Sequence, residues 1–424
     1  MIRRKSNNRI GIAHIFWFYW TVLVAWQNLN PQTARSGGDL VLKIGLIAML
    51  TVFYFSRARK VSVNIVPICL FALTMLCSWL LSGDSISASN LISYSYPVLL
   101  VLLAFGIGND FQINQKEFFF FLNGVILVTL YAALYAIFFQ TEYFRMALSR
   151  SAAYGYELSS FFYSSHEYGM YLVYSIIACL ICMETDTKTG VKKKLLYVAA
   201  VIVFLLNLVL TFSRTSLLAL AVFAAAYFFV GKWSKLRKWA LTAGGCAIVA
   251  VVFSAKLQNF IRLVLFKKQN GLGERGDLYR LAKDLFWDGT PIQKVFGHGV
   301  EVQQVFIGAL GHKDVHNAYL QVLMYFGLIG LVFLLGIFFS QLRANIRLYR
   351  YSKFYSVMFS AFLFSALAMM LTNTAIIFTS PIDSYFLTVF VVLVPKYVRN
   401  AICAGTFEQP DRRVMNDYFH KRIH

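Results

Sequence analysis

Long apolar stretches recur along the sequence, each of about 20 residues and most of them separated by short polar segments. A helix of that length matches the hydrocarbon core of a bilayer, which is roughly 30 Å thick. Lipid offers the backbone no hydrogen-bonding partner, so an apolar segment crosses it as a helix that pairs its own peptide groups. Of the 424 residues, 58% are hydrophobic and only 14% are charged, with a mean hydropathy of +0.62. The sequence therefore predicts an all-α polytopic membrane protein.

The apolar stretches divide the chain into twelve predicted spans within one membrane domain, residues 1–424. The first span follows "MIRRKSNNR" without a small-residue cleavage site, so we expect a retained helix and not a signal peptide. The largest extramembrane segment is a loop at 256–317, between the ninth and tenth spans, which we expect to be helical and extracytoplasmic. The predicted spans cover residues 10–29, 40–55, 61–81, 91–108, 118–139, 166–183, 195–212, 214–230, 239–255, 318–340, 355–372 and 382–398.

The formal net charge of +21 does not indicate a nucleic-acid partner, because the charge follows the predicted topology. Basic clusters such as "SRARK", "GVKKK" and "KWSKLRK" all fall on one side of the membrane if the spans alternate. An excess of Lys and Arg in cytoplasmic loops is the usual orientation signal of membrane proteins. We therefore predict that both termini, including a tail at 400–424, are cytoplasmic, and that these clusters contact membrane lipids.

One basic residue on the predicted outer face is not explained by that signal. Arg214 lies in "LTFSRTSLLAL", between two apolar runs. Because a guanidinium is costly to bury near lipid, such an arginine usually faces a cavity or a partner and is a candidate functional residue. The alternative is an arginine that extends toward water at a short outer turn. The flanking Ser213, Thr215 and Ser216 make this turn polar, which favours the functional interpretation.

The outer loop carries the other unexplained basic residues. Its segment "ERGDLYRLAKDLFWDGTP" predicts an amphipathic helix over about 275–287, ended by the Gly-Thr-Pro at 289–291. Arg275, Arg280 and Lys283 lie on this helix, and arginine forks match the oxygen pairs of phosphate groups. The alternative is a surface helix with salt bridges to its own aspartates. The predicted apolar face consists of Leu278, Leu281, Leu285 and Phe286, and the following tight turn is marked by Gly297 and Gly299.

The pair His316-Asn317 stands where the chain enters the tenth predicted span from the outside. The ordinary pKa of histidine, about 6.5, suits the removal of a proton near neutral pH, so His316 could deprotonate a hydroxyl. The alternative is a polar cap on the helix, with Asn317 contributing. His312 and His316 have a spacing that can bind zinc, but the glutamate of a HExxH pattern is missing. We expect neither a metal nor a cofactor.

A second outer segment, 140–169, is rich in aromatic and small polar residues. Tyr163 and His166 could line a groove for a sugar substrate, since aromatic side chains stack on sugar rings. The alternative is the ordinary belt of tyrosines at a membrane interface, which this composition favours. Other residues considered for the same groove are Tyr154, Tyr156 and Glu167.

Three motifs together resemble the superfamily of bacterial O-antigen polymerases and O-antigen ligases. "HNAYLQVLMYFGLIG" is similar to the family signature of His-Asn, nine residues, Gly, two residues and Gly, met here by His316, Asn317, Gly327 and Gly330. "SRTSLLAL" resembles the family's Ser-Arg turn, and "ERGDLYRLAKDLFWDGTPIQKVFGHGV" its outer stretch from an Arg to a Gly-x-Gly turn. The resemblance covers about 195–340. Gly276 follows Arg275, so the helix could begin later and leave Arg280 as the functional arginine.

The resemblance implies a metal-independent, GT-C-like membrane glycosyltransferase in the cytoplasmic membrane of a bacterium. Its donor would be a glycan on undecaprenyl pyrophosphate at the outer face. Arg214 and either Arg275 or Arg280 would bind the pyrophosphate, and His316 would be the base. Further substrate-binding residues would be Asn317, Lys283, Tyr163 and His166.

Two activities fit this resemblance. A polymerase joins repeat units into O-antigen, capsule or exopolysaccharide; a ligase moves the finished glycan to lipid A core or to another acceptor. A flippase and a chain-length regulator would be partner proteins. A transporter of polysaccharide precursors is the alternative from a different class, although we find neither paired halves nor a carboxylate in the middle of a span.

Overall fold

The computed structural model describes residues 65–102, 105, 112–142, 145, 158–162, 164–185, 190–230, 274–311, 315–373 and 387–407. All regular secondary structure in these ranges is helical, which confirms the predicted all-α class for them. Within the described residues, six helices are long and apolar enough to cross a membrane. They are α4 (Ile65–Ser82), α6 (Gln115–Phe139), α8 (Ser165–Thr185), α9 (Val191–Leu210), α16 (Ala318–Leu348) and α17 (Lys353–Met370).

Nine of the twelve predicted spans fall wholly or partly within the described residues, and each of these contains a helix. Besides the six long helices they correspond to α5 (Ala88–Val101), α10 (Arg214–Val230), and a π-helical turn at Val389–Leu393 that continues into α19 (Val394–Cys403). The predicted spans at 10–29, 40–55 and 239–255 lie outside the described residues. The total of twelve therefore stays a prediction.

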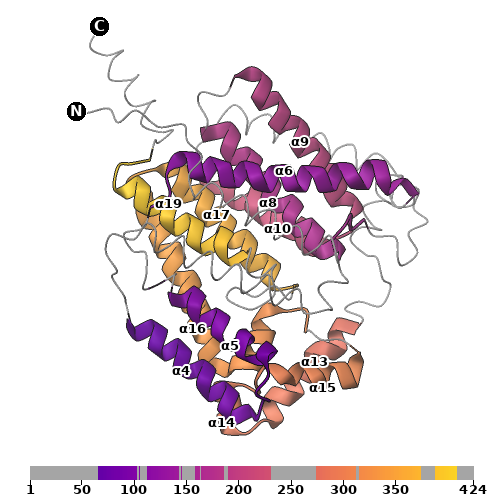
Figure 1. The fold of residues 1–424 in the computed structure, drawn as a ribbon, viewed down its shortest axis with the longest axis vertical. Helices are drawn as coiled ribbons and strands as arrows, with labels where there is room; N and C mark the ends of the chain where they lie inside the picture. Colours follow the sequence, from indigo (N-terminus) through magenta and orange to yellow (C-terminus); the bar gives the residue numbers. More distant parts are fainter. Residues whose placement is uncertain are drawn as a thin grey trace.

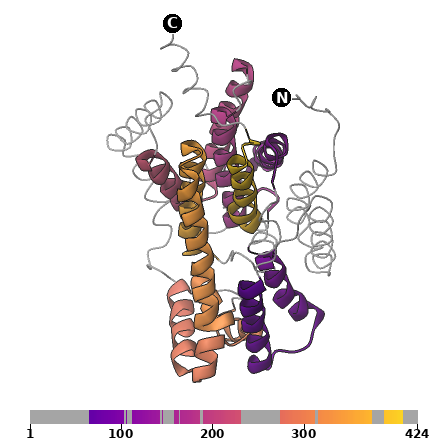
Figure 2. The ribbon, with the colours of Figure 1, turned by 90° about the vertical axis from the view of Figure 1, so that its left-hand side faces the viewer.

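Helix α8 lies at the centre of the helix packing and is buried along most of its length, with apolar and small residues on every face. A helix that is hydrophobic all round is expected in such a position. It contacts α6, α9 and α10, and α10 packs along α17 (Figure 1). In contrast, α4 exposes Leu70, Leu73 and Leu80, which is the pattern of a helix that faces lipid. Figure 2 shows α16 running beside the outer helices at one end and beside α19 at the other.

The outer loop is helical, as predicted. It contains α13 (Glu274–Asp288), α14 (Pro291–Phe296), a 3-10 turn at Val300–Val302 and α15 (Gln303–Leu310), gathered beside the ends of α4 and α16 (Figure 1). Thr290 caps α14, because its hydroxyl accepts a hydrogen bond from the Gln293 N–H at 3.3 Å. Pro291 occupies the first helical position, where the missing N–H costs no intrahelical bond.

The predicted helix over about 275–287 is confirmed, and the alternative that it begins after Gly276 is wrong, since α13 begins at Glu274 and includes Gly276. A glycine inside a helix costs about 1 kcal/mol relative to alanine. The apolar face of α13 offsets that cost: Leu278 is buried, with Leu281, Leu285 and Phe286 packed around the same small core. Other members of this core are Ala282, Val302, Phe306, Val315 and Met324.

Two glycines allow the outer loop to lie directly against α16. Gly297 has φ +89°, and a Cβ atom added to it would lie 2.3 Å from the carbonyl oxygen of Tyr325. Gly327 has φ +66° and interrupts α16, with an added Cβ 2.3 Å from the carbonyl oxygen of Val295. Only glycine adopts these conformations at so short a backbone separation. The predicted tight turn at Gly297 is confirmed, whereas the break in α16 at Gly327 is a finding of the structure.

Two carboxylates fasten the outer loop to the α4–α5 pair. Asp84 Oδ2 accepts hydrogen bonds from the Tyr94 hydroxyl at 2.7 Å and from the Val300 N–H at 2.8 Å. On the side of the outer loop, Glu301 Oε1 accepts hydrogen bonds from two groups of the α4–α5 segment, the Ser85 N–H at 3.1 Å and Asn90 Nδ2 at 2.7 Å. The hydrogen bonds from Ser85 and Asn90 hold the pKa of the Glu301 carboxyl below its usual range. We call Asp84 and Glu301 with these partners the carboxylate latch.

Candidate functional site

His316 lies directly before α16, in a backbone conformation that few residues other than glycine adopt. Its φ is +53° and its side chain is half-buried. The helix cap is Asn317, because Asn317 Oδ1 accepts hydrogen bonds from the N–H groups of Tyr319 at 3.0 Å and Leu320 at 3.1 Å. The left-handed conformation costs a non-glycine residue on the order of 1–3 kcal/mol, and such strain is concentrated at functional sites. His316 is therefore a candidate functional residue, and the capping oxygen belongs to its neighbour.

Contacts with other elements fix the position of His316. The Tyr279 hydroxyl of α13 donates to the carbonyl oxygen of His316 at 3.4 Å. The Tyr319 hydroxyl donates to the carbonyl oxygen of Leu367 near the end of α17 at 3.0 Å. The start of α16 is thus held between the outer loop on one side and α17 on the other.

Arg214 is the first residue of α10 and its side chain is exposed, so it is not a guanidinium buried inside a span. Its neighbours Ser213, Thr215 and Ser216 are buried. Thr372, which follows α17, donates from its hydroxyl to that of Thr215 at 2.8 Å. A cation at a helix N-terminus opposes the helix dipole, while an anion there is stabilised. The Ser216 N–H is already hydrogen-bonded to the Ser213 hydroxyl, so the exposed Arg214 guanidinium is the group at this helix start that would attract an anion.

His166 lies in the first turn of α8 and contacts the turn that precedes Arg214. Its Nδ1 atom is 3.1 Å from the hydroxyl oxygen of Ser213, which lies 2.9 Å from the hydroxyl oxygen of Ser216. Gly169 makes this approach possible, since a Cβ atom added to it would lie 2.4 Å from the Ser216 hydroxyl oxygen. The N-termini of α8 and α10 therefore lie together.

His166 also lies within electrostatic reach of Arg275 and of His316. Arg275 is half-buried near the start of α13, whereas Arg280 and Lys283 are exposed further along the same helix. Five residues along an α-helix turn the side chain by about 140°, so Arg280 cannot point in the same direction as Arg275. Of these two arginines, Arg275 is the one that lies within electrostatic reach of His166.

The structure brings four of the predicted site residues to one region: Arg275 and His316 lie within electrostatic reach of His166, and Arg214 follows Ser213, which His166 contacts. It places Arg280 and Lys283 on the exposed side of α13 and uses the Asn317 side-chain oxygen as a cap. Tyr163 lies outside the described residues, as does His312, the second histidine considered for a metal.

Sequence reasoning did not identify three contributors to this arrangement. Ser213 and Gly169 bring α8 against the start of α10, and Tyr279 ties α13 to His316. The position of Ser213 beside a solitary outer arginine was the only available signal for it. Gly169 and Tyr279 gave no signal, because their roles depend on contacts between segments far apart in the sequence.

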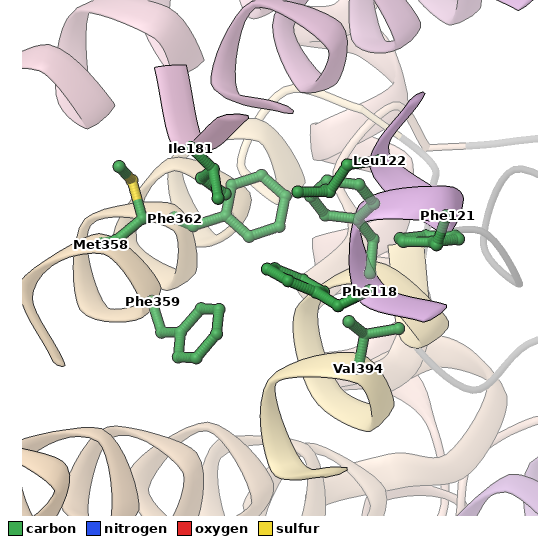
Figure 3. A pocket seen from close by; sticks show the side chains of 9 residues that line it. Phe118, Phe121, Leu122, Ile181, Met358, Phe359, Phe362 and Val394 are labelled. Carbon is green, nitrogen blue, oxygen red and sulfur yellow. The ribbon is translucent and has the colours of Figure 1, made fainter. Parts of the chain in front are cut away.

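An apolar pocket lies away from this site. Its empty volume is about 280 Å³, and its lining includes Phe118 and Leu122 from the start of α6 and Phe362 from α17 (Figure 3). Ile181, which also lines it, is fifteen residues along α8 from His166, or about 22 Å of helix. No polar side chain lines the pocket, so it offers no binding group for a phosphate or a sugar. The remaining lining residues are Phe121, Met358, Phe359, Phe390 and Val394.

The described part of the chain is thus a helical membrane protein with cationic and imidazole side chains collected where the N-termini of α8, α10, α13 and α16 meet. Residues 199–335 match a family model described as O-antigen ligase, which supports the resemblance found in the sequence motifs over this region. The matched range contains Arg214, Arg275, His316 and both signature glycines. A search of curated proteins gave no match.

Proposed function

We propose that this protein is a glycosyltransferase that polymerises oligosaccharide repeat units carried on undecaprenyl pyrophosphate into a surface polysaccharide. The reaction takes place at the outer face of the cytoplasmic membrane. The observation that carries the proposal is the convergence of Arg214, Arg275 and His316 within the family-matched region, at the ends of helices long enough to span a membrane. A site at the end of a membrane helix is where a lipid-linked sugar and its acceptor can both arrive.

The reaction transfers the growing glycan from one lipid carrier to a sugar hydroxyl on another. His316 takes the proton of that hydroxyl, whose oxygen then forms a bond to the anomeric carbon of the donor sugar. The bond between the anomeric carbon and the pyrophosphate oxygen breaks, and its electron pair leaves with undecaprenyl pyrophosphate. His316 afterwards gives the proton to water, which restores the neutral imidazole.

The two arginines stabilise the negative charge that develops on the pyrophosphate. Arg275 is held on the outer loop and Arg214 at the N-terminus of α10, so the leaving group would lie between two cations. Such charge stabilisation by groups already in place is commonly the largest contribution to an enzymatic rate. The chemistry as written needs no metal ion, because the pyrophosphate is a good leaving group once its charge is balanced.

The family description favours one second candidate function, an O-antigen ligase that transfers the finished glycan to lipid A core or to another acceptor. The donor and the leaving group are the same in both reactions, so the same arginines and histidine serve either. In both cases a flippase would supply the lipid-linked units; in the polymerase, a chain-length regulator would set the product size.

The test is to delete the gene in its host, restore it with wild type or His316→Ala, and measure the size of the glycan on each lipid. A polymerase predicts single repeat units in the deletion strain and in the mutant, with His316→Ala slowed about 10²- to 10⁴-fold in vesicles. Long chains that remain on undecaprenyl pyrophosphate would identify the ligase. Near-normal extension by His316→Ala would contradict the assigned site, and repeat units left facing the cytoplasm would indicate a transporter.

A further inference from the structure

His166 and Ser213 are the most completely defined pair of polar side chains at the site, although they are 47 residues apart in the sequence. Ser213 is fully buried and Ser216 nearly so, and their hydroxyls lie within hydrogen-bonding distance of one another. A buried hydroxyl without a hydrogen-bonding partner is costly. The Ser216 hydroxyl, the Ser213 hydroxyl and the His166 ring therefore satisfy one another in a fixed order.

The backbone around Ser213 is shaped to hold it in this place. Phe212 has φ +50°, a conformation that costs a residue with a side chain, and it lies in the turn between α9 and α10. The Ser213 N–H donates to the Thr211 hydroxyl at 3.2 Å, and the Thr211 hydroxyl donates to the carbonyl oxygen of Leu208 at 2.7 Å. Strain together with these bonds fixes the direction of the Ser213 side chain.

Because Nδ1 of His166 is taken by Ser213, the Nε2 atom is the ring nitrogen left for another molecule. No residue in the described parts of the chain hydrogen-bonds Nε2, and the His166 side chain is partly exposed. Its charged surroundings are Arg275 and His316, the two residues assigned to the leaving group and to the base. His166 therefore stands beside the reacting atoms with one ring nitrogen available.

The chemistry of this nitrogen selects its ligand. The serine hydroxyls can turn either way, so Nε2 is a donor in one tautomer and an acceptor in the other. A sugar hydroxyl both donates and accepts and so matches either state, whereas a phosphate oxygen only accepts. Arg275, which carries a positive charge nearby, is the residue assigned to the pyrophosphate, so His166 is not needed to bind that anion.

We propose that Ser213 is a positioning residue that holds the His166 ring with Nε2 toward the acceptor, where it hydrogen-bonds a hydroxyl of the acceptor sugar across from His316. This inference rests on the proposed glycosyl transfer. It assigns to the serine of the Ser-Arg turn a role separate from that of Arg214: the arginine binds the leaving group and the serine orients the acceptor through His166.

A double-mutant cycle tests the inference on the full-length protein in membrane vesicles from the deletion strain. The substrate is the lipid-linked single repeat unit extracted from that strain, and the measurement is the initial rate of chain extension. Ser213→Ala and His166→Ala are each expected to lower the rate about 3- to 10-fold, the range of one neutral hydrogen bond. In the His166→Ala background, Ser213→Ala is expected to have no further effect, because the side chain that it positions is gone.

Ser365→Ala is the matched control. Ser365 is equally buried and donates to the carbonyl oxygen of Ala219 at 2.7 Å, joining α17 to α10 away from the site. Ser365→Ala also removes a buried serine hydroxyl that contacts α10, but at the interface with α17, and it should leave the rate unchanged in both backgrounds. If Ser213→Ala fails to accumulate, Ser213→Cys, which weakens the hydrogen bond but keeps a side chain of similar shape, replaces it in the cycle.

An equal loss from Ser213→Ala in both backgrounds would mean a purely structural role and would overturn the inference. So would a wild-type rate for either single variant. Failure of the proposed function gives a different pattern, since His316→Ala would then extend chains normally whatever the outcome of the cycle. If His316→Ala abolishes chain extension and the losses of rate from Ser213→Ala and His166→Ala are additive, the proposed function stands and only the role assigned to Ser213 is rejected.

Discussion

Two regions of this protein use arginine in opposite ways. Arg399 of α19 is buried and donates two hydrogen bonds of 2.6 Å, to Asn345 Oδ1 and to Gln341 Oε1 of α16. At the outer ends of the helices, Arg214 is exposed and Arg275 half-buried, and within the described residues neither donates a hydrogen bond to the protein. The first arginine has its donors engaged by the fold. The donors of Arg214 and Arg275 are not engaged by any described residue.

This contrast refines the usual inference from a charged residue in a membrane protein. An arginine within a span is a candidate functional residue by default, because burying its charge is costly. Arg399 shows that two amide side chains can accept hydrogen bonds from a buried guanidinium. The arginine then joins two helices, here α19 and α16. The more informative signs of function here are arginine donors that no described residue accepts from, and strained backbone at Phe212 and His316.

The largest effect that separates the two regions is expected from Arg275→Ala. Loss of a charge-assisted hydrogen bond to the pyrophosphate removes about 1.5–3 kcal/mol, so kcat/KM should fall about 10- to 100-fold. The matched control is Arg280→Ala on the exposed side of the same helix, which should change kcat/KM by less than about 2-fold. Both are measured as chain extension in vesicles, with equal protein levels. A larger loss in Arg280→Ala than in Arg275→Ala would reverse the assignment of the loop arginine.

Arg399→Met should act on stability instead of activity. Methionine fills a similar volume but leaves the amide oxygens of Asn345 and Gln341 buried without a donor, at a cost of about 1–3 kcal/mol for such a group. Removing a desolvated charge offsets part of that cost, so a lower Tm of modest size is expected. Arg350→Met, at an exposed position after α16, is the control and should leave Tm unchanged. An unchanged Tm together with a large loss of activity per folded molecule would assign Arg399 to function.

Prediction from the sequence was most successful where the structure of a segment is determined by the residues of that segment. The apolar spacing of Leu278, Leu281 and Leu285, followed by a Gly-Thr-Pro stop, predicted a helix within one residue of the observed α13 at either end. Gly276 misled the alternative prediction, since a local propensity was outweighed by packing on Val302, Phe306 and Met324. Helix propensity is a weak guide wherever tertiary contacts are this close.

The residue types of the site could be predicted from the sequence, but their arrangement in space could not. Arg214, Arg275 and His316 are recognisable because each is polar at an outer helix end and because the motifs resemble a family. The contact between His166 and Ser213 depends on how α8 lies against the turn before α10, which Gly169 permits. The position of Gly327 inside a long apolar run gives no sign that it would interrupt α16, because the cause is the Val295 backbone on a different segment.

The smallest predicted effect concerns the carboxylate latch, which holds the outer loop and with it Arg275. Hydrogen bonds from Ser85 and Asn90 hold the pKa of Glu301 below its ordinary value of about 4.3. A carboxyl whose pKa is lowered on folding contributes stability above its unfolded pKa and loses it as the pH falls through the folded value. The latch is therefore fully formed at neutral pH and weakens only in acid.

Glu301→Gln should reproduce part of the acid state at neutral pH, because the neutral amide accepts weaker hydrogen bonds from Ser85 and Asn90. The readout is the protection factor of the amides in 274–311, because the intrinsic exchange rate itself changes with pH. This protection should fall modestly in Glu301→Gln at pH 7 and depend less on acid than in wild type. Glu142→Gln, whose carboxyl is exposed and takes part in no latch, is the control. Protection that is lost equally with acid in wild type and Glu301→Gln would show that groups other than Glu301 hold the loop.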